Sequence, residues 1–64
     1  MAAIVEAFRA ITKHELTTEQ GWLFMEVVKL VRSQQGAYRP DNYEDAVAYA
    51  ALRGEAASLE RGEA

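Results

Sequence analysis

Apolar residues recur at helical spacing in three segments of the chain, and polar stretches separate these segments. In the first segment the apolar residues form one stripe: Ile4, Val5, Phe8 and Ile11. This stripe predicts an amphipathic helix over about residues 2–13. The polar sequence KHELTT follows and marks a break before the next segment.

The middle segment carries the clearest boundary signals. Thr17 and Gln20 have the spacing of a capping box, in which each side chain binds a free backbone N–H group at the start of a helix. Gly36 follows the segment and suits a left-handed cap at its end. We therefore expect a helix over about residues 18–35. One wide arc of this helix is apolar and predicts the centre of the core: Leu23, Phe24, Val27, Val28, Leu30 and Val31.

The opposite side of the middle helix mixes polar residues with a second apolar stripe. Trp22 and Met25 lie one helical turn apart, and Lys29 continues the stripe. Aromatic and methionine side chains are enriched at protein interfaces, which favours a contact with another protein. Coverage by the first helix, folded back on the middle one, would explain the stripe equally well. Both interpretations stay open at this point.

The third segment begins after a loop that contains Pro40. Proline disfavours helical geometry at the residue before it, and Asp41 with Glu44 has the spacing of a second capping pair. We therefore expect Asp41 as the N-cap of a helix over about residues 42–59, followed by a frayed tail at 60–64. One face of this helix is expected to pack on the middle helix: Tyr43, Ala46, Val47, Ala50, Gly54 and Ala57.

Another face of the third helix combines a carboxylate with larger side chains. Asp45 needs a cationic partner there, because an unpaired charge on a covered face costs free energy. Lys29 and Arg32 are the natural candidates. The predicted ion-pair cluster consists of Lys29, Arg32, Asp41, Asp45 and Tyr49. The predicted contact residues of an interaction surface are Trp22, Met25, Leu52 and Leu59.

Composition excludes several classes of site and partner. The 64 residues contain no cysteine and one histidine, so the chain has no disulfide, thiolate metal site or histidine cluster. Its seven basic residues are scattered among ten acidic ones, which argues against nucleic-acid binding. No apolar run reaches the ~20 residues of a membrane-spanning helix, and no signal peptide opens the chain. We therefore expect a cytoplasmic protein without nucleic-acid or membrane partners.

The chain is also too short to bury a large core. Small domains without disulfides or structural metals have a small free energy of unfolding, and many of them oligomerise. The sequence therefore predicts a single all-α domain over residues 1–64. We expect a three-helix antiparallel arrangement that completes its core by forming a homodimer or homotetramer.

The acidic residues raise one catalytic alternative, a carboxylate site for magnesium. A magnesium site needs several carboxylates that converge from neighbouring helices. The candidates are Glu26, Asp41, Glu44 and Asp45. Asp41 and Glu44 are better explained as helix caps, and Glu26 as a solvated residue one turn before Lys29. We therefore expect no catalytic residue, metal or cofactor, and keep magnesium as the alternative.

The stretch FMEVVKLVRSQQGAYRPDNYEDAVAYAAL resembles the C-terminal part of a small domain family of phages and prophages. That family combines Lys-x-x-Arg, a polar loop ending in Asp-Asn, and an Asp before a Gly-Tyr-Ala segment. Lys29 and Arg32 match the basic pair. The other matches are Asp41, Asn42, Asp45 and Tyr49, and Ala48 replaces the usual glycine. The likeness extends over about residues 16–52.

The family pattern is in turn similar to that of all-α, MazG-like nucleoside triphosphate pyrophosphatases. Those enzymes hold magnesium with a Glu-x-x-Glu pair on one helix and a Glu-x-x-Asp pair on the next. Glu26 lacks an acidic neighbour at this spacing, because Leu23 and Lys29 stand three residues away on either side. The resemblance therefore implies the fold more than the activity.

Together, the residues and the resemblance predict a phage- or prophage-type helical protein-interaction module. We expect it to bind itself and a host factor, in the cytoplasm of the host cell if it is phage encoded. The alternative is a reduced pyrophosphatase that uses magnesium and the acidic residues named above. An interaction protein is the favoured interpretation over an enzyme.

Overall fold

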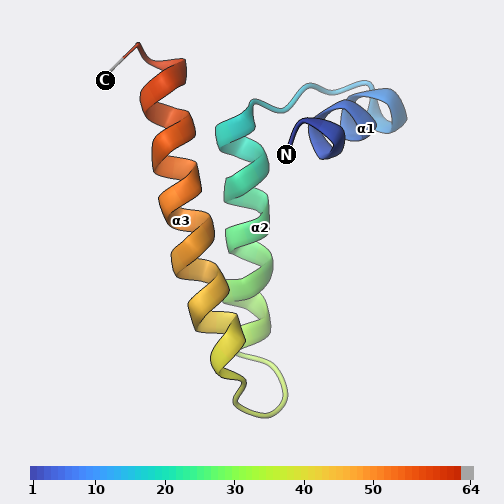
Figure 1. Cartoon of the computed structure of the whole chain (residues 1–64). Coiled ribbons are helices and arrows are strands. Elements are labelled where there is room, and N and C mark those ends of the chain that lie inside the picture. Colours follow the sequence, from blue (N-terminus) through green and yellow to red (C-terminus); the bar gives the residue numbers. More distant parts are fainter. Residues whose placement is uncertain (63–64) are drawn as a thin grey trace.

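The computed structural model describes residues 1–62 and consists of three helices (Figure 1). They are α1 (Ala2–Thr12), α2 (Thr18–Ser33) and α3 (Pro40–Glu60). Helices α2 and α3 lie side by side in opposite directions, whereas α1 extends away from this pair near the N-terminal end of α2 (Figure 1). The predicted all-α class is confirmed, and the antiparallel arrangement holds for α2 and α3 only. None of the helices in the described part of the chain combines the length and apolar character that crossing a membrane requires.

Helix α2 begins where the sequence predicts. The Thr17 hydroxyl accepts a hydrogen bond from the Gln20 backbone N–H at 3.1 Å, and the Thr17 N–H donates to Gln20 Oε1 at 3.0 Å. Both halves of the capping box are therefore present. The helix ends at Ser33, slightly before the predicted end. Gly36, with a φ of 67°, makes the left-handed turn in the loop beyond, which glycine does without steric cost.

Helix α3 begins earlier than predicted, and the assignment of Asp41 as its N-cap is wrong. Pro40 is the first helical residue, and Arg39 occupies the N-cap position. Proline is favoured there because an N–H at the first helical position would have no partner within the helix. Asp41 lies in the first turn instead, where the helix dipole favours an acidic residue. The helix continues to Glu60, and residues 63 and 64 of the predicted tail lie outside the described residues.

The three helices form a single layer, with principal extents of 37 × 32 × 14 Å. One helix with its side chains is about 10–12 Å wide, so the thinnest dimension leaves no room for a second layer. The radius of gyration of 13.2 Å exceeds the value of about 11 Å expected for a compact domain of this length. Among residues 1–62, Ala56 is the one buried apolar side chain. The described chain therefore does not enclose an apolar core by itself.

The apolar arc of α2 faces away from α3, so its prediction as the centre of the core is wrong. Five residues of this arc, here called the outer face of α2, are 43–60% exposed: Leu23, Phe24, Val27, Leu30 and Val31. The small-residue face predicted on α3 is also partly turned outward, with Val47 72% exposed. The side of α3 that meets α2 carries Asp45 and Tyr49 instead. Polar and aromatic side chains with specific partners therefore decide the orientation.

Candidate interaction surface

The contact between α2 and α3, here called the seam, contains a cluster of charges near the connecting loop. Lys29 Nζ donates to Asp45 Oδ2 at 2.8 Å and lies 3.7 Å from Asp41 Oδ2. Lys29 is only 9% exposed. The hydrogen bond to Asp45 raises the pKa of the Lys29 ammonium group above its ordinary value of 10.5, although desolvation acts in the opposite direction. The predicted Lys29–Asp45 pair is therefore confirmed.

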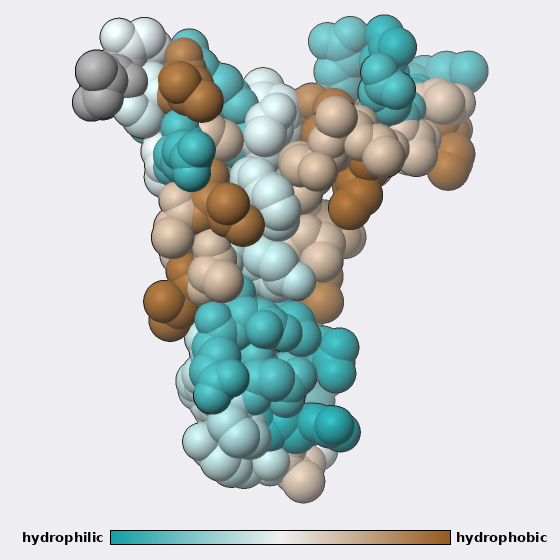
Figure 2. Space-filling view, viewed as in Figure 1, coloured by the Kyte–Doolittle hydropathy of each residue, from teal (hydrophilic) through white to brown (hydrophobic). Residues whose placement is uncertain are grey.

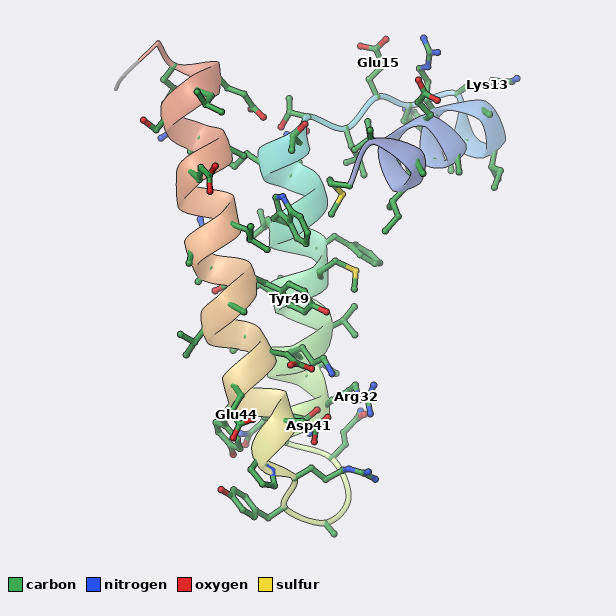
Figure 3. The ribbon with its side chains drawn as sticks, in the orientation of Figure 1. Lys13, Glu15, Arg32, Asp41, Glu44 and Tyr49 are labelled. Carbon is green, nitrogen blue, oxygen red and sulfur yellow. The ribbon has the colours of Figure 1, made fainter. Side chains whose placement is uncertain are left out.

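Arg32 is not part of this cluster, contrary to the prediction. Successive residues of a helix are about 100° apart, so Arg32 is rotated by about 60° from Lys29 around α2. Its side chain points away from α3 (Figure 3), and no ion pair joins it to another residue within 1–62. Arg39 in the loop lies closer to the cluster, with its Nε 3.7 Å from Asp41 Oδ1.

Two aromatic rings pack across the seam. Trp22 of α2 stacks on Tyr49 of α3, with ring centroids 5.8 Å apart and ring planes inclined by 25°. Tyr49 points from α3 toward α2 (Figure 3). The sequence placed Tyr49 in the ion-pair cluster, whereas the structure gives it a stacking role. Much of the Trp22 ring is therefore already used within the chain.

Two further ion pairs along the seam join residues that the sequence analysis did not connect. Arg53 Nε donates to Glu26 Oε1 at 2.8 Å, and Arg61 Nη2 donates to Glu19 Oε1 at 3.1 Å. Glu60 Oε2 also accepts a hydrogen bond from the Glu19 backbone N–H at 2.9 Å. Glu26 is therefore paired rather than solvated. The partners lie 27 and 42 residues apart, so only the register of α3 against α2 reveals them.

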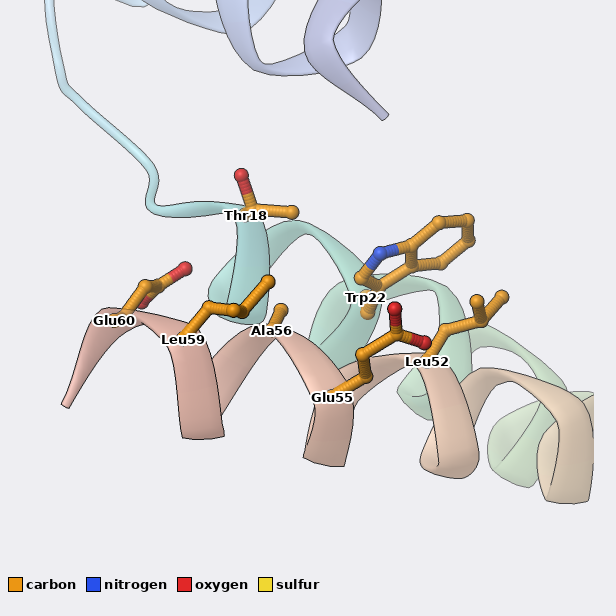
Figure 4. A pocket seen from close by; sticks show the side chains of 7 residues that line it. All are labelled: Thr18, Trp22, Leu52, Glu55, Ala56, Leu59 and Glu60. Atoms are coloured by element: carbon orange, nitrogen blue, oxygen red, sulfur yellow. The ribbon is translucent and has the colours of Figure 1, made fainter. Parts of the chain in front are cut away.

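A cleft of about 230 Å³ opens beside Trp22 between α2 and α3 (Figure 4). Its lining defines the Trp22 cleft: Thr18, Trp22, Leu52, Glu55, Ala56, Leu59 and Glu60. The structure thus brings together three of the predicted contact residues, Trp22, Leu52 and Leu59. Met25 is half-buried on α2 and does not line this cleft. That these residues bind a partner stays a prediction.

The outer face of α2 lies opposite the seam and contains no charged residue. Helix α1 adds Ile4 and Ile11, which are also exposed. Figure 2 shows hydrophobic side chains along one side of α1 and along the adjoining flank of α2, where the two helices form a corner. Contiguous apolar surface of this kind marks interaction sites on proteins. Sequence analysis identified these α2 residues as apolar and clustered, but assigned them to the core.

A family model for a domain of unknown function, DUF6378, matches residues 1–57. The chain belongs to this family. No curated protein and no solved structure matches it. The matched span of the DUF6378 domain includes α1, α2, most of α3 and the whole outer face of α2.

Four of the residues that carry the sequence resemblance lie at one end of the seam in this DUF6378 domain. Lys29, Asp41 and Asp45 form the ion-pair cluster. Asn42, next to Asp41 in the chain, is also buried, and its Oδ1 has no hydrogen-bond partner among residues 1–62. Arg32 lies on the flank of α2. The three residues of the ion-pair cluster therefore join α3 to α2 beside the loop that connects them.

The four acidic residues of the alternative magnesium site do not converge on one point in the described part of the DUF6378 domain. Glu26 pairs with Arg53, while Asp41 and Asp45 share Lys29. Glu44 is exposed and points away from α2 (Figure 3). Within residues 1–62, no group of three or more His, Cys, Asp or Glu side chains is placed to hold one metal ion. The pyrophosphatase-like activity stays a prediction that this geometry does not favour.

Proposed function

We propose that this DUF6378 chain is a small helical protein-interaction module whose main binding surface is the outer face of α2. The observation that carries the proposal is that charged side chains lie between the helices and apolar side chains lie on the surface, the reverse of the usual arrangement. Charged groups occupy the seam, whereas five large apolar residues of α2 are 43–60% exposed. Covering apolar area contributes about 25 cal/mol per Å², so a partner that covers this face gains free energy.

The chemistry of the outer face indicates what kind of partner fits it. The face contains five aliphatic or aromatic side chains, no charge and no backbone edge that could pair with a strand. An amphipathic helix that presents its own apolar stripe is the matching surface. The Trp22 cleft, with Leu52 and Leu59 exposed at its side, is a second surface for the same kind of contact.

The finer parts of this proposal depend on the sequence resemblance. A phage or prophage origin, a host factor as one partner and the host-cell cytoplasm as the compartment are what that resemblance implies. Three of the residues that carry it, Lys29, Asp41 and Asp45, form the ion-pair cluster on the side of α2 opposite its outer face. A partner can therefore bind the outer face without disturbing the cluster.

A photo-crosslinking side chain at position 24 tests the proposal in the native cell. Phe24 is 60% exposed on the outer face, and a benzophenone-bearing phenylalanine there adds reactive reach without adding charge. The matched control carries the same group at Val47, which is 72% exposed on α3. Irradiation is expected to give an adduct of defined mass from position 24 only. The absence of an adduct at position 24, or equal yields at both positions, would contradict the proposal.

A further inference from the structure

We infer that a second copy of this chain covers the outer face of α2, with the two α2 helices antiparallel about a twofold axis at Val27. This inference rests on the proposed function and names the partner of that surface. The sequence led us to expect self-association and placed Trp22 and Met25 among the contact residues of the interaction surface. The structure assigns the contact to the opposite side of the helix.

The positions of the outer-face residues along the sequence are symmetric about Val27, as a twofold axis requires. Phe24 and Leu30 lie three residues before and after Val27, and Leu23 and Val31 lie four residues before and after it. An antiparallel copy centred on Val27 therefore places each apolar side chain opposite another apolar side chain. Contacts between identical subunits about a twofold axis require such a self-complementary surface. A second copy meets this requirement without any rearrangement of α2.

The charge distribution favours the same partner. Each chain carries a formal charge of −3, and a neutral contact surface keeps the like charges of two copies at a distance where salt screens their repulsion. The outer face contains no charged residue. Three of the four charged residues of α2 are paired at the seam: Lys29, Glu26 and Glu19. The fourth, Arg32, lies on the flank of α2 and outside the outer face. The face is therefore the neutral part of an acidic molecule.

The exposed area matches the requirement of a dimer. The chain exposes 4819 Å², whereas area scaling predicts about 4,100 Å² for a folded monomer of its 7.1 kDa mass. The excess of about 700 Å² is close to the ~800 Å² that each partner contributes to an interface of standard size. Two single-layer copies joined at α2 would form the two-layer architecture in which helical domains normally enclose a core.

Sedimentation velocity over a concentration series tests the second copy, with two matched lysine variants. Val27→Lys puts two like charges at the twofold axis, whereas Val47→Lys puts the same charge on an exposed part of α3. The wild type and Val47→Lys are expected to sediment as dimers, and Val27→Lys as a monomer at the same concentration. A wild type that is monomeric throughout, or a Val27→Lys variant that remains dimeric, overturns the inference.

Cross-linking of single-cysteine variants tests the orientation independently of whether Val27→Lys folds. The chain has no cysteine of its own, so Phe24→Cys and Leu30→Cys each introduce one thiol. In an antiparallel dimer, a short bifunctional maleimide is expected to link a Phe24→Cys chain to a Leu30→Cys chain when the two variants are mixed. Links within each variant alone, in place of the mixed product, would show parallel packing and overturn the twofold at Val27.

The outcomes separate this inference from the proposed function. A position-24 photo-adduct with a different protein, together with a monomeric wild type, supports the interaction module and overturns self-docking. A position-24 adduct of twice the chain mass supports both. The absence of any adduct at position 24 overturns both, because it shows that nothing covers the outer face.

Discussion

The seam and the outer face are two sides of the same helix, and each has the character expected of the other. The seam holds Lys29, Glu26 and Trp22 against partners on α3, although two of these residues are charged. The outer face holds only apolar side chains and faces away from the rest of the described chain. In most domains, the apolar side of a helix faces the core of its own chain. Here that side is left uncovered by the described part of the chain.

This difference shows that apolar character and partner identity are separate properties of a helix face. Burial of apolar area is non-directional, so an apolar stripe is satisfied by any apolar surface that covers it. Ion pairs and stacked rings are directional, because each needs one partner at one distance. In this chain the directional contacts set the register of α3 on α2. These contacts leave the outer face uncovered by residues 1–62.

Replacement of one aromatic residue on each side of α2 gives the largest expected contrast. In solution dilute enough for monomers, Trp22→Ala is expected to lower the free energy of unfolding by about 3 kcal/mol, because it removes the ring that stacks on Tyr49. Phe24→Ala is expected to lower it by less than about 1 kcal/mol under the same conditions. Urea unfolding followed by circular dichroism measures both. Equal losses for the two variants would show that the seam and the outer face do not differ as described.

The concentration dependence sharpens the same comparison. The loss in Phe24→Ala is expected to grow as the protein concentration rises, because the proposed dimer gives the wild type contacts that the variant lacks. The loss in Trp22→Ala is expected to stay nearly constant, since its contact lies within one chain.

Removal of a carboxylate from the seam is expected to have the next largest effect. Asp45→Ala leaves Lys29 without its 2.8 Å partner and is expected to lower Tm by about 5–10 °C. Asp41→Ala, whose carboxylate lies at 3.7 Å, is expected to lower it by less than about 3 °C. Glu44→Ala is the control, since Glu44 is exposed and has no ion pair among residues 1–62. An unchanged Tm in Asp45→Ala would show that the ion pair does not stabilise the fold.

Alkaline pH is expected to weaken the seam by a smaller and gradual amount. The pKa of Lys29 is raised above 10.5 in the folded chain by its hydrogen bond to Asp45. Its contribution to stability is therefore complete below the unfolded pKa near 10.5 and is lost as the pH rises through the higher folded pKa. Chemical unfolding from pH 8 to pH 12, compared between the wild type and Lys29→Met, measures this loss as a difference. Parallel curves for the two proteins would contradict the assignment.

The local signals of the sequence predicted local structure well, and long-range contacts poorly. The capping box of Thr17 and Gln20 was predictable because its atoms lie within one helical turn. The Lys29–Asp45 pair followed from the need to neutralise a single carboxylate. The outer orientation of Val27 was not predictable, since hydrophobicity indicates burial without indicating which molecule provides it.

Two other errors have equally physical causes. Pro40 was left outside α3 because the spacing of Asp41 and Glu44 favoured Asp41 as the N-cap, whereas Pro40 fits the first helical position, where no N–H is needed. The Glu26–Arg53 pair joins residues 27 positions apart and depends on how far α3 slides along α2. The position of α3 along α2 is set by how the two helices pack, and it cannot be read from composition or from the spacing of apolar residues.

Magnesium with a nucleoside triphosphate is expected to have the smallest effect of all, and it tests the pyrophosphatase alternative. A ligand at one hundred times its dissociation constant raises the free energy of unfolding by about 2.7 kcal/mol, or more than 10 °C in Tm for a chain of this size. The carboxylates of Glu26 and Asp45 are each within 2.8 Å of a cation of the protein, and a metal ion would have to displace it. We therefore expect a Tm change below about 1 °C at millimolar concentrations of both ligands. A rise above about 3 °C that is lost in Glu26→Gln would favour the enzyme, because that substitution removes a metal ligand while keeping the shape of the side chain.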